Sequence, residues 1–305
     1  MLFALCILIL VGIIWTTTGV VMGGVARKGV AVESMQCVSY LLGTVVCLLL
    51  LPLYPSIELK GGWVLFALGM YFLVGVLNYF VNVTMTAAMK RGPNSLVWAI
   101  LQAGMIVPFV VGICLHDVHA GPLRLIGMAV MLTALALISM DRSETSGGDG
   151  NAWLVLSFVT FLIVGVQQSV NTEPSYYPEI RSGIPILYRC LALCAGNFVA
   201  TLPYAMRLAF KGEGARLRDE LSGRWLWFYA ILLQTSILVE KLFLSYRGMD
   251  MMAKLGSGAI SYPVMVISCI AFFTLYSIVF LHEKVTWRSA CGLVLCTSGI
   301  VLLSF

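Results

Sequence analysis

Apolar runs of about twenty residues follow one another along almost the whole chain, and they constrain its fold more than any other feature. An α-helix rises about 1.5 Å per residue, so a run of this length crosses the hydrocarbon core of a bilayer. In lipid every backbone N–H and C=O must be bonded within the protein, and these runs are too long and too uniformly apolar for the strands of a membrane barrel. The sequence therefore predicts an all-α integral membrane protein.

The balance of residue types agrees with lipid as the main solvent. Hydrophobic residues make up 60% of the 305 residues and charged residues 11%, whereas a soluble domain carries about 25% charged residues. The formal net charge of +5 comes from Lys and Arg scattered in short loops rather than from a dense basic stripe, so we do not expect a nucleic acid partner. The expected partners are the lipid bilayer and a small-molecule substrate.

The runs predict ten transmembrane helices, and the first of them has no charged region or cleavage site of a signal peptide, so we expect it to persist as a helix. One connecting segment, rich in Ser, Gly and Asp, has the composition of a linker. It divides the chain into residues 1–140, the linker 141–151 and residues 152–305. The ten spans are placed at 2–22, 31–51, 62–89, 94–115, 122–140, 152–172, 184–206, 225–246, 256–281 and 287–304.

The two parts look like copies of one another. Matching glycines recur in the same order along both parts, namely Gly12 with Gly165, Gly43 with Gly196, and Gly127 with Gly292. Five helices is an odd number, so tandem copies must enter the membrane from opposite sides. The sequence therefore predicts two inverted five-helix repeats, an architecture in which secondary transporters bind their substrates near the midplane, where the halves meet.

Three ionisable residues are the main cases within predicted spans, where a charge costs about 2.5 to 3.5 kcal/mol at the helix centre. They are Arg189, Glu240 and Lys241. In one interpretation Lys241 or Arg189 holds an anionic substrate group, and Glu240 is a counter-charge or the site of a coupling proton or sodium ion. In the other, Glu240 pairs with Arg189 or Lys241 and only fixes the packing. Because Glu240 and Lys241 are adjacent, we expect their side chains to diverge by about 100° and to find different partners.

Amide and aromatic residues inside the spans complete the candidate site. We expect a central cavity lined from both halves, suited to a sugar, an amino acid or a nucleoside. Some of these residues would instead serve as interhelical hydrogen bonds or ordinary core, an alternative that applies above all to Trp98. The candidate substrate-binding residues are Trp15, Asn78, Gln102, Gln168, Arg189, Glu240, Lys241 and Tyr262.

The nine cysteines all lie inside apolar runs and form no CxxC pair. They are expected to be small buried hydrophobic residues, so we predict no disulfide. Cys190 and Cys194 share a helix face, but no histidine is near them in the sequence, so neither a metal site nor a cofactor is expected.

Two helix ends carry a family resemblance. The fourth span ends in His116-Asp117 before a helix containing Gly127, and the ninth ends in His282-Glu283-Lys284 before Gly292 and Gly299. With Gly12 and Trp15 in the first span, this pattern resembles the EamA-like families of the drug/metabolite transporter superfamily, which have two five-helix repeats. In the first half Asp117 stands where these families usually have glutamate. Gln36 in the second span stands where they often have arginine, whereas Arg189 in the seventh span keeps that arginine.

The resemblance implies a secondary transporter that works by alternating access. Residues 75–79 are also similar to rhamnose-type sugar permeases of the same superfamily, which gives a weak preference for a sugar as the substrate. It also implies cytoplasmic termini. The excess of Lys and Arg in the odd-numbered loops instead predicts that these loops are cytoplasmic and the termini outside, so the orientation stays open.

The alternative functions are an integral membrane enzyme acting on lipid-like substrates, and a receptor or scaffold. The chain has no HExxH, GxSxG, phosphate-binding loop or paired-aspartate motif, and no extramembrane domain. We therefore expect a multi-pass permease of the cell membrane rather than an enzyme.

Overall fold

The computed structural model describes residues 2–57, 61–116, 121–140, 151–254, 261–282 and 286–303. Throughout these residues the chain is helical and has no strand, which confirms the predicted all-α class. Residues 141–150 of the predicted linker lie outside the described residues, and so do Asp117, Glu283 and Lys284.

The part before the predicted linker forms six α-helices, and helix-breaking residues mark several of their ends. Gly29 follows the first helix with a φ of 65°, the left-handed conformation that commonly ends a helix. The elements are α1 (Leu2–Lys28), α2 (Val32–Leu50), η1 (Leu51–Leu53), α3 (Gly62–Met89), α4 (Asn94–Gln102), η2 (Ala103–Met105), α5 (Ile106–His116) and α6 (Pro122–Met140).

The part after the predicted linker forms eight more described α-helices. Pro178 begins α8 and Gly212, with a φ of 70°, follows α9, which are the usual places of Pro and Gly at helix ends. The elements are α7 (Ala152–Thr172), η3 (Glu173–Tyr176), α8 (Pro178–Gly183), α9 (Ile186–Phe210), α10 (Gly214–Ser222), α11 (Arg224–Val239), η4 (Glu240–Ser245), α12 (Tyr246–Lys254), α13 (Ser261–Phe280) and α14 (Trp287–Leu303).

Six described helical stretches are long and apolar enough to cross a membrane. Large apolar side chains on their outer faces are exposed, among them Leu49, Leu65 and Phe228; such surfaces suit contact with lipid rather than with water. Three shorter apolar helices of 10–17 residues accompany them. The six stretches are Leu2–Lys28, Val32–Leu53, Gly62–Met89, Ala152–Tyr176, Ile186–Phe210 and Arg224–Met252.

Two predicted spans depart from regular α-helix. The span predicted at 94–115 is interrupted by a single 3-10 turn, η2, between α4 and α5. Pro108 explains the position, because its missing N–H would have bonded the carbonyl of Gly104. The span predicted at 225–246 instead continues to Lys254 through a π-helical turn, η4.

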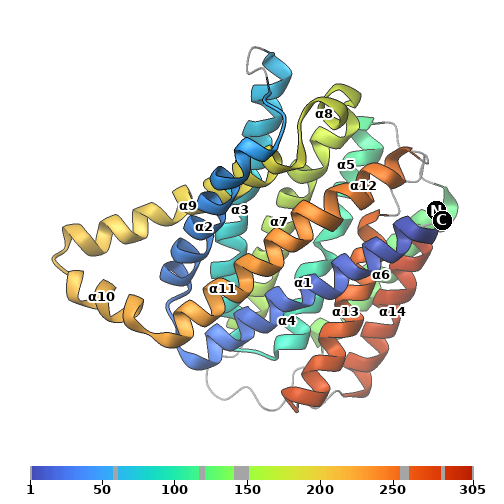
Figure 1. Ribbon diagram of the computed structural model, residues 1–305. Helices are drawn as coiled ribbons and strands as arrows, with labels where there is room; N and C mark the ends of the chain where they lie inside the picture. The colour runs from blue at the N-terminus through green and yellow to red at the C-terminus, as the bar shows by residue number, and fades with distance from the viewer. Residues whose placement is uncertain are drawn as a thin grey trace.

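Most contacts between the long helices join a helix from before the predicted linker to one from after it. α3 packs against α7 and α9, α2 packs against α9 and α11, and α1 packs against α13 and α11. α6 and α14 pack against each other on one side of the bundle, and α10 projects from the opposite side (Figure 1).

Glycines allow four of these helix contacts to be close. A Cβ on Gly12 would lie 2.3 Å from the carbonyl oxygen of Met265 in α13, and one on Gly165 would lie 2.3 Å from Val107 in α5. In the same way Gly43 of α2 faces Gln234 of α11, and Gly196 of α9 faces the backbone of α3, at Phe72. At Gly12 and Gly196 a larger residue would meet backbone and push the partner helix away, whereas at Gly43 and Gly165 it would displace the side chain of Gln234 or Val107.

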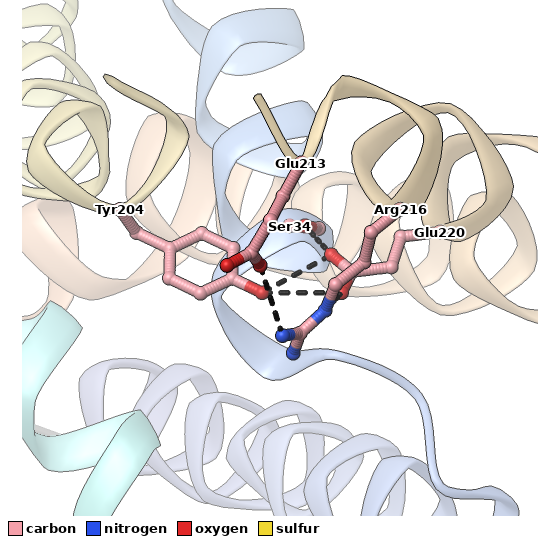
Figure 2. Close-up of polar contacts among 5 residues, drawn as sticks. All are labelled: Ser34, Tyr204, Glu213, Arg216 and Glu220. Atoms are coloured by element: carbon pink, nitrogen blue, oxygen red, sulfur yellow. Dashed lines mark hydrogen bonds and ion pairs between the residues drawn. The ribbon is translucent and has the colours of Figure 1, made fainter. Parts of the chain in front are cut away.

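The short helix α10 is fastened to the ends of two long helices by Glu220. Its carboxylate accepts hydrogen bonds from Ser34 Oγ of α2 at 2.5 Å, from Tyr204 OH of α9 at 3.2 Å and from Arg216 Nε at 3.0 Å (Figure 2). Arg216 also contacts Glu213. These hydrogen bonds therefore tie the projecting helix α10 to α2 and α9.

Candidate functional site

A cavity of about 140 Å³ lies at the centre of the bundle. A cavity of about 150 Å³ accommodates benzene, so this one matches a small molecule. Its walls come from both parts of the chain: α1, α2, α3 and α4 on one side and α7, α9, α11, η4 and α13 on the other.

Seven of the eight candidate residues line this cavity. Arg189 is the exception. Whether the seven bind a substrate stays a prediction, but the structure brings them together around one space. They are Trp15, Asn78, Gln102, Gln168, Glu240, Lys241 and Tyr262.

Amide side chains form a connected polar wall that joins the two parts of the chain. Gln167 Nε2 of α7 donates a hydrogen bond to Asn78 Oδ1 of α3 at 3.1 Å, and Asn78 in turn donates to the hydroxyl of Tyr40 of α2. Asn171 Nδ2 of α7 donates to the hydroxyl of Tyr262 of α13 at 2.6 Å. These bonds hold the amides in fixed orientations at the cavity surface.

Three residues of this wall have an amide oxygen that lacks a protein donor. Gln168 Oε1, Asn171 Oδ1 and Asn82 Oδ1 are buried and have no hydrogen-bond partner within the part of the chain that the structure describes, and all three residues line the cavity. A buried acceptor without a partner costs free energy. These oxygens are therefore suited to accept hydrogen bonds from a molecule in the cavity.

The charged part of the wall is an ion pair between neighbouring residues. Lys241 Nζ lies 3.2 Å from Glu240 Oε1, so the expectation that these side chains diverge to different partners was wrong. The long flexible stem of the lysine can bring its ammonium group to the neighbouring carboxylate, and the pair lies at the start of a π-helical turn. π turns are rare inside α-helices and frequently mark functional sites.

Aromatic rings surround the ammonium group of this pair. Lys241 Nζ lies 5.8 Å from the ring centroid of Trp15 and 5.4 Å from that of Tyr246, within the range of cation–π attraction. The Lys241 side chain is 12% exposed and that of Glu240 is 3% exposed. The cavity therefore presents an ammonium group that is held by a carboxylate and by rings.

Arg189 lies outside the cavity wall, which corrects its place among the lining residues. Its Nε donates to the carbonyl of Ile184 at 3.1 Å and its Nη2 to that of Ile180 at 3.2 Å. Its Nη1 lies 3.7 Å from Asp250 Oδ2, and the side chain is 2% exposed. The predicted alternative pairing with Glu240 is thus replaced by Asp250, and the guanidinium connects α9 to α8 and α12.

Sequence reasoning missed two polar residues on α2. Tyr40 lines the cavity, and Gln36, one turn before it, is fully buried behind the wall. Gln36 Oε1 accepts hydrogen bonds from Asn82 Nδ2 at 2.9 Å and from Asn197 Nδ2 at 3.4 Å. The spacing of four residues between Gln36 and Tyr40, a polar stripe on one helix face, was the signal available in the sequence.

Comparison with known proteins reveals the fold but no family. No known family profile matches the chain, and no curated protein matches it. Nineteen chains of solved structures match it. One, described only as "Crystal structure of protein", has a TM-score of 0.62 and 13% sequence identity over 99% of this chain and 98% of that chain. At this identity the likeness shows that the fold occurs elsewhere and nothing of activity.

Proposed function

We propose that this chain is a multi-pass membrane permease that moves a small polar or amphipathic metabolite by alternating access. The observation that carries the proposal is the central cavity, whose polar wall is contributed by both parts of the chain. Secondary transporters built from repeats bind their substrates at the interface between the repeats. The six membrane-length helices and their exposed apolar faces support a location in the lipid bilayer of the cell membrane.

The proposal includes ten spans arranged as two inverted repeats, and matching helix contacts support it. Gly12 of the first span faces α13 in the ninth, as Gly165 of the sixth faces α5 in the fourth. Gly43 of the second span faces α11 in the eighth, as Gly196 of the seventh faces α3 in the third. Each contact becomes the other when the two halves are exchanged. A twofold axis relating halves of five spans each would lie in the membrane plane.

The packing of whole helices is likewise unchanged when the two halves are exchanged. α3, the third span, packs against α7 and α9, the sixth and seventh. Correspondingly α11, in the eighth span, packs against α1 and α2, the first and second. α6 and α14, the fifth and tenth, pack against each other. This pattern favours a molecule in which either half can shift against the other around the cavity.

The chemistry of the wall defines the substrate that we propose. Free acceptors at Gln168 and Asn171 suit hydroxyl or amino donors, and the rings of Trp15 and Tyr262 suit a flat or apolar face. Lys241 suits an anionic or electron-rich group. Sugars, amino acids and nucleosides all offer such combinations, and the resemblance to sugar permeases adds a weak preference for a sugar. Glu240 is the proposed group for a coupling proton or sodium ion.

Binding and transport together test this proposal. The purified protein is screened for thermal stabilisation by sugars, amino acids and nucleosides, since a ligand at 100 times its Kd stabilises the folded state by about 2.7 kcal/mol. A stabilising class is then supplied to liposomes containing the protein. We expect uptake that Gln168→Leu abolishes and that Thr133→Val, an exposed change on α6, leaves intact. Stabilisation without uptake, or uptake that Gln168→Leu does not change, contradicts the proposal.

A further inference from the structure

Three cysteine thiols meet where α2 packs against α9. Cys47 comes from α2, and Cys190 and Cys194, one turn apart, come from α9. Their Sγ atoms all lie within 4.8 Å of one another, all three residues are 0% exposed, and all are free thiols. The sequence places Cys47 far from the other two, so only the fold reveals the cluster.

The spacing suits one ion held by three sulfurs. With metal–sulfur bonds of about 2.3 Å, three sulfurs lie roughly 4.0 Å apart around a planar ion and roughly 3.4 Å apart around a pyramidal one. The thiols of this cluster therefore need to close by less than roughly 1.5 Å. Sulfur ligands select soft, thiophilic ions over hard ions such as Mg²⁺ or Ca²⁺.

The charge of the surroundings decides which soft ion fits. The nearest polar groups are neutral: Gln234 Nε2 donates to Cys194 Sγ at 3.6 Å, and Tyr40 also lies close to Cys194 and Cys190. The guanidinium of Arg189 is directed to backbone carbonyls and Asp250. Three thiolates leave a net charge with a monovalent or a divalent ion but none with a trivalent one. A net charge in a buried apolar site is costly, so the trivalent ion is favoured.

We propose that Cys47, Cys190 and Cys194 form a three-thiol site for a trivalent thiophilic metalloid of the arsenic(III) and antimony(III) class. The uncharged trihydroxide exchanges its three hydroxyl groups for the three thiols. Each S–H proton leaves with one hydroxyl group as water, so three As–O bonds break, three As–S bonds form and three waters are released. Nothing is oxidised or reduced, and the site is uncharged before and after. Binding of this kind does not depend on the proposed transport activity.

Arsenite and the full-length purified protein provide the test. Mass spectrometry of the wild-type chain should show one bound arsenic, with the mass of the atom less three hydrogens, and X-ray absorption should show three sulfur neighbours and no oxygen. Cys37→Ala, on the same helix α2 but outside the cluster, should bind in the same way. Cys47→Ala leaves two thiols, so its adduct should keep a hydroxyl group and should be lost at arsenite concentrations that saturate the wild type.

Several results would overturn the site. They are no bound arsenic, an arsenic with fewer than three sulfur neighbours in the wild type, or the same three-hydrogen adduct in Cys47→Ala. Preferential binding of Zn²⁺ or Cd²⁺, measured by competition against arsenite, would contradict the argument from charge. If Cys47→Ala does not fold, the X-ray absorption measurement on the wild type decides the question alone.

Discussion

Two ion pairs lie near the ring of Tyr246, and their cations have different surroundings. Lys241 and Glu240 line the cavity, while Arg189 and Asp250 connect helices outside it. Both cations lie over the same ring, Lys241 Nζ at 5.4 Å and the Arg189 guanidinium carbon at 5.7 Å. Arg189 also donates to two backbone carbonyls, whereas Lys241 borders open space. A charge inside an apolar span can therefore serve packing alone, so its position in the span does not by itself indicate that it faces a cavity.

The largest expected effect comes from breaking the packed pair. Arg189→Gln should lower the free energy of unfolding by about 3 kcal/mol, because it removes the buried charge that faces Asp250 and the donors to the carbonyls of Ile180 and Ile184. Unfolding in detergent measures this, with Lys211→Gln, an exposed position after α9, as the control. If Arg189→Gln abolishes uptake at unchanged stability, Arg189 belongs to the binding site after all.

For the cavity pair, Glu240 and Lys241, we expect a small loss of stability and a large loss of uptake. Replacing both charges, Glu240→Gln with Lys241→Gln, strands neither group, so the loss of unfolding free energy should be less than half of that for Arg189→Gln. Uptake should nevertheless be abolished, because the cavity loses its only described charged groups. Uptake assays and unfolding curves on the same preparations measure both effects. A large loss of stability with residual uptake would make this pair structural too.

Removing the hydroxyl group of Tyr262 or of Tyr246 should have a smaller effect on stability than breaking the Arg189 pair, and the two effects should differ. Tyr262→Phe removes the acceptor of the Asn171 amide and should cost about 1 kcal/mol. The hydroxyl of Tyr246 is buried with no hydrogen-bond partner in the described part of the chain, so Tyr246→Phe should be neutral or slightly stabilising. The midpoint of thermal unfolding should therefore fall for Tyr262→Phe and stay the same or rise slightly for Tyr246→Phe. Equal losses in the two variants would show that the Tyr246 hydroxyl has a hydrogen-bond partner.

A small loss that depends on salt is expected at the pair between the exposed Arg216 and Glu220. Arg216→Gln should lower the midpoint of unfolding by less than Tyr262→Phe does, and the loss should vanish at high salt, because exposed charges are screened by ions. Unfolding at low and high ionic strength measures this. A shift that persists at high salt would mean that Glu220 needs Arg216 to hold α10 against α2 and α9.

The sequence predicted the all-α class because long apolar runs in lipid must satisfy their backbone hydrogen bonds internally. It predicted seven of the residues that line the cavity because a polar side chain in an apolar span avoids lipid by facing other helices, so Asn78, Gln168 and Glu240 were expected to point inward. The glycines were predicted only as landmarks of the repeat, and the structure adds that four of them lie at close helix contacts. Ten spans in inverted order stay a prediction, as do the roles of the cavity residues in binding.

The remaining features depend on contacts that no local pattern specifies. Arg189 is held by carbonyls of α8, a short helix between predicted spans, and by Asp250, which lies beyond the predicted end of the eighth span. Lys241 pairs with its own neighbour Glu240 through its flexible stem, and a π turn begins at this pair. Cys47 joins Cys190 and Cys194 only through the packing of α2 on α9.

The π turn from Glu240 to Ser245 also limits which lengths of chain are tolerated here. A π turn holds more residues than the α-helical turn that it replaces, so deleting one residue would restore a continuous α-helix from α11 to α12. The helix beyond the deletion would keep nearly its present orientation relative to α11, because the π turn absorbs its extra residue within itself. Deleting one residue from the regular part of α11 would instead rotate everything after it by about 100°, and Asp250 would turn away from Arg189.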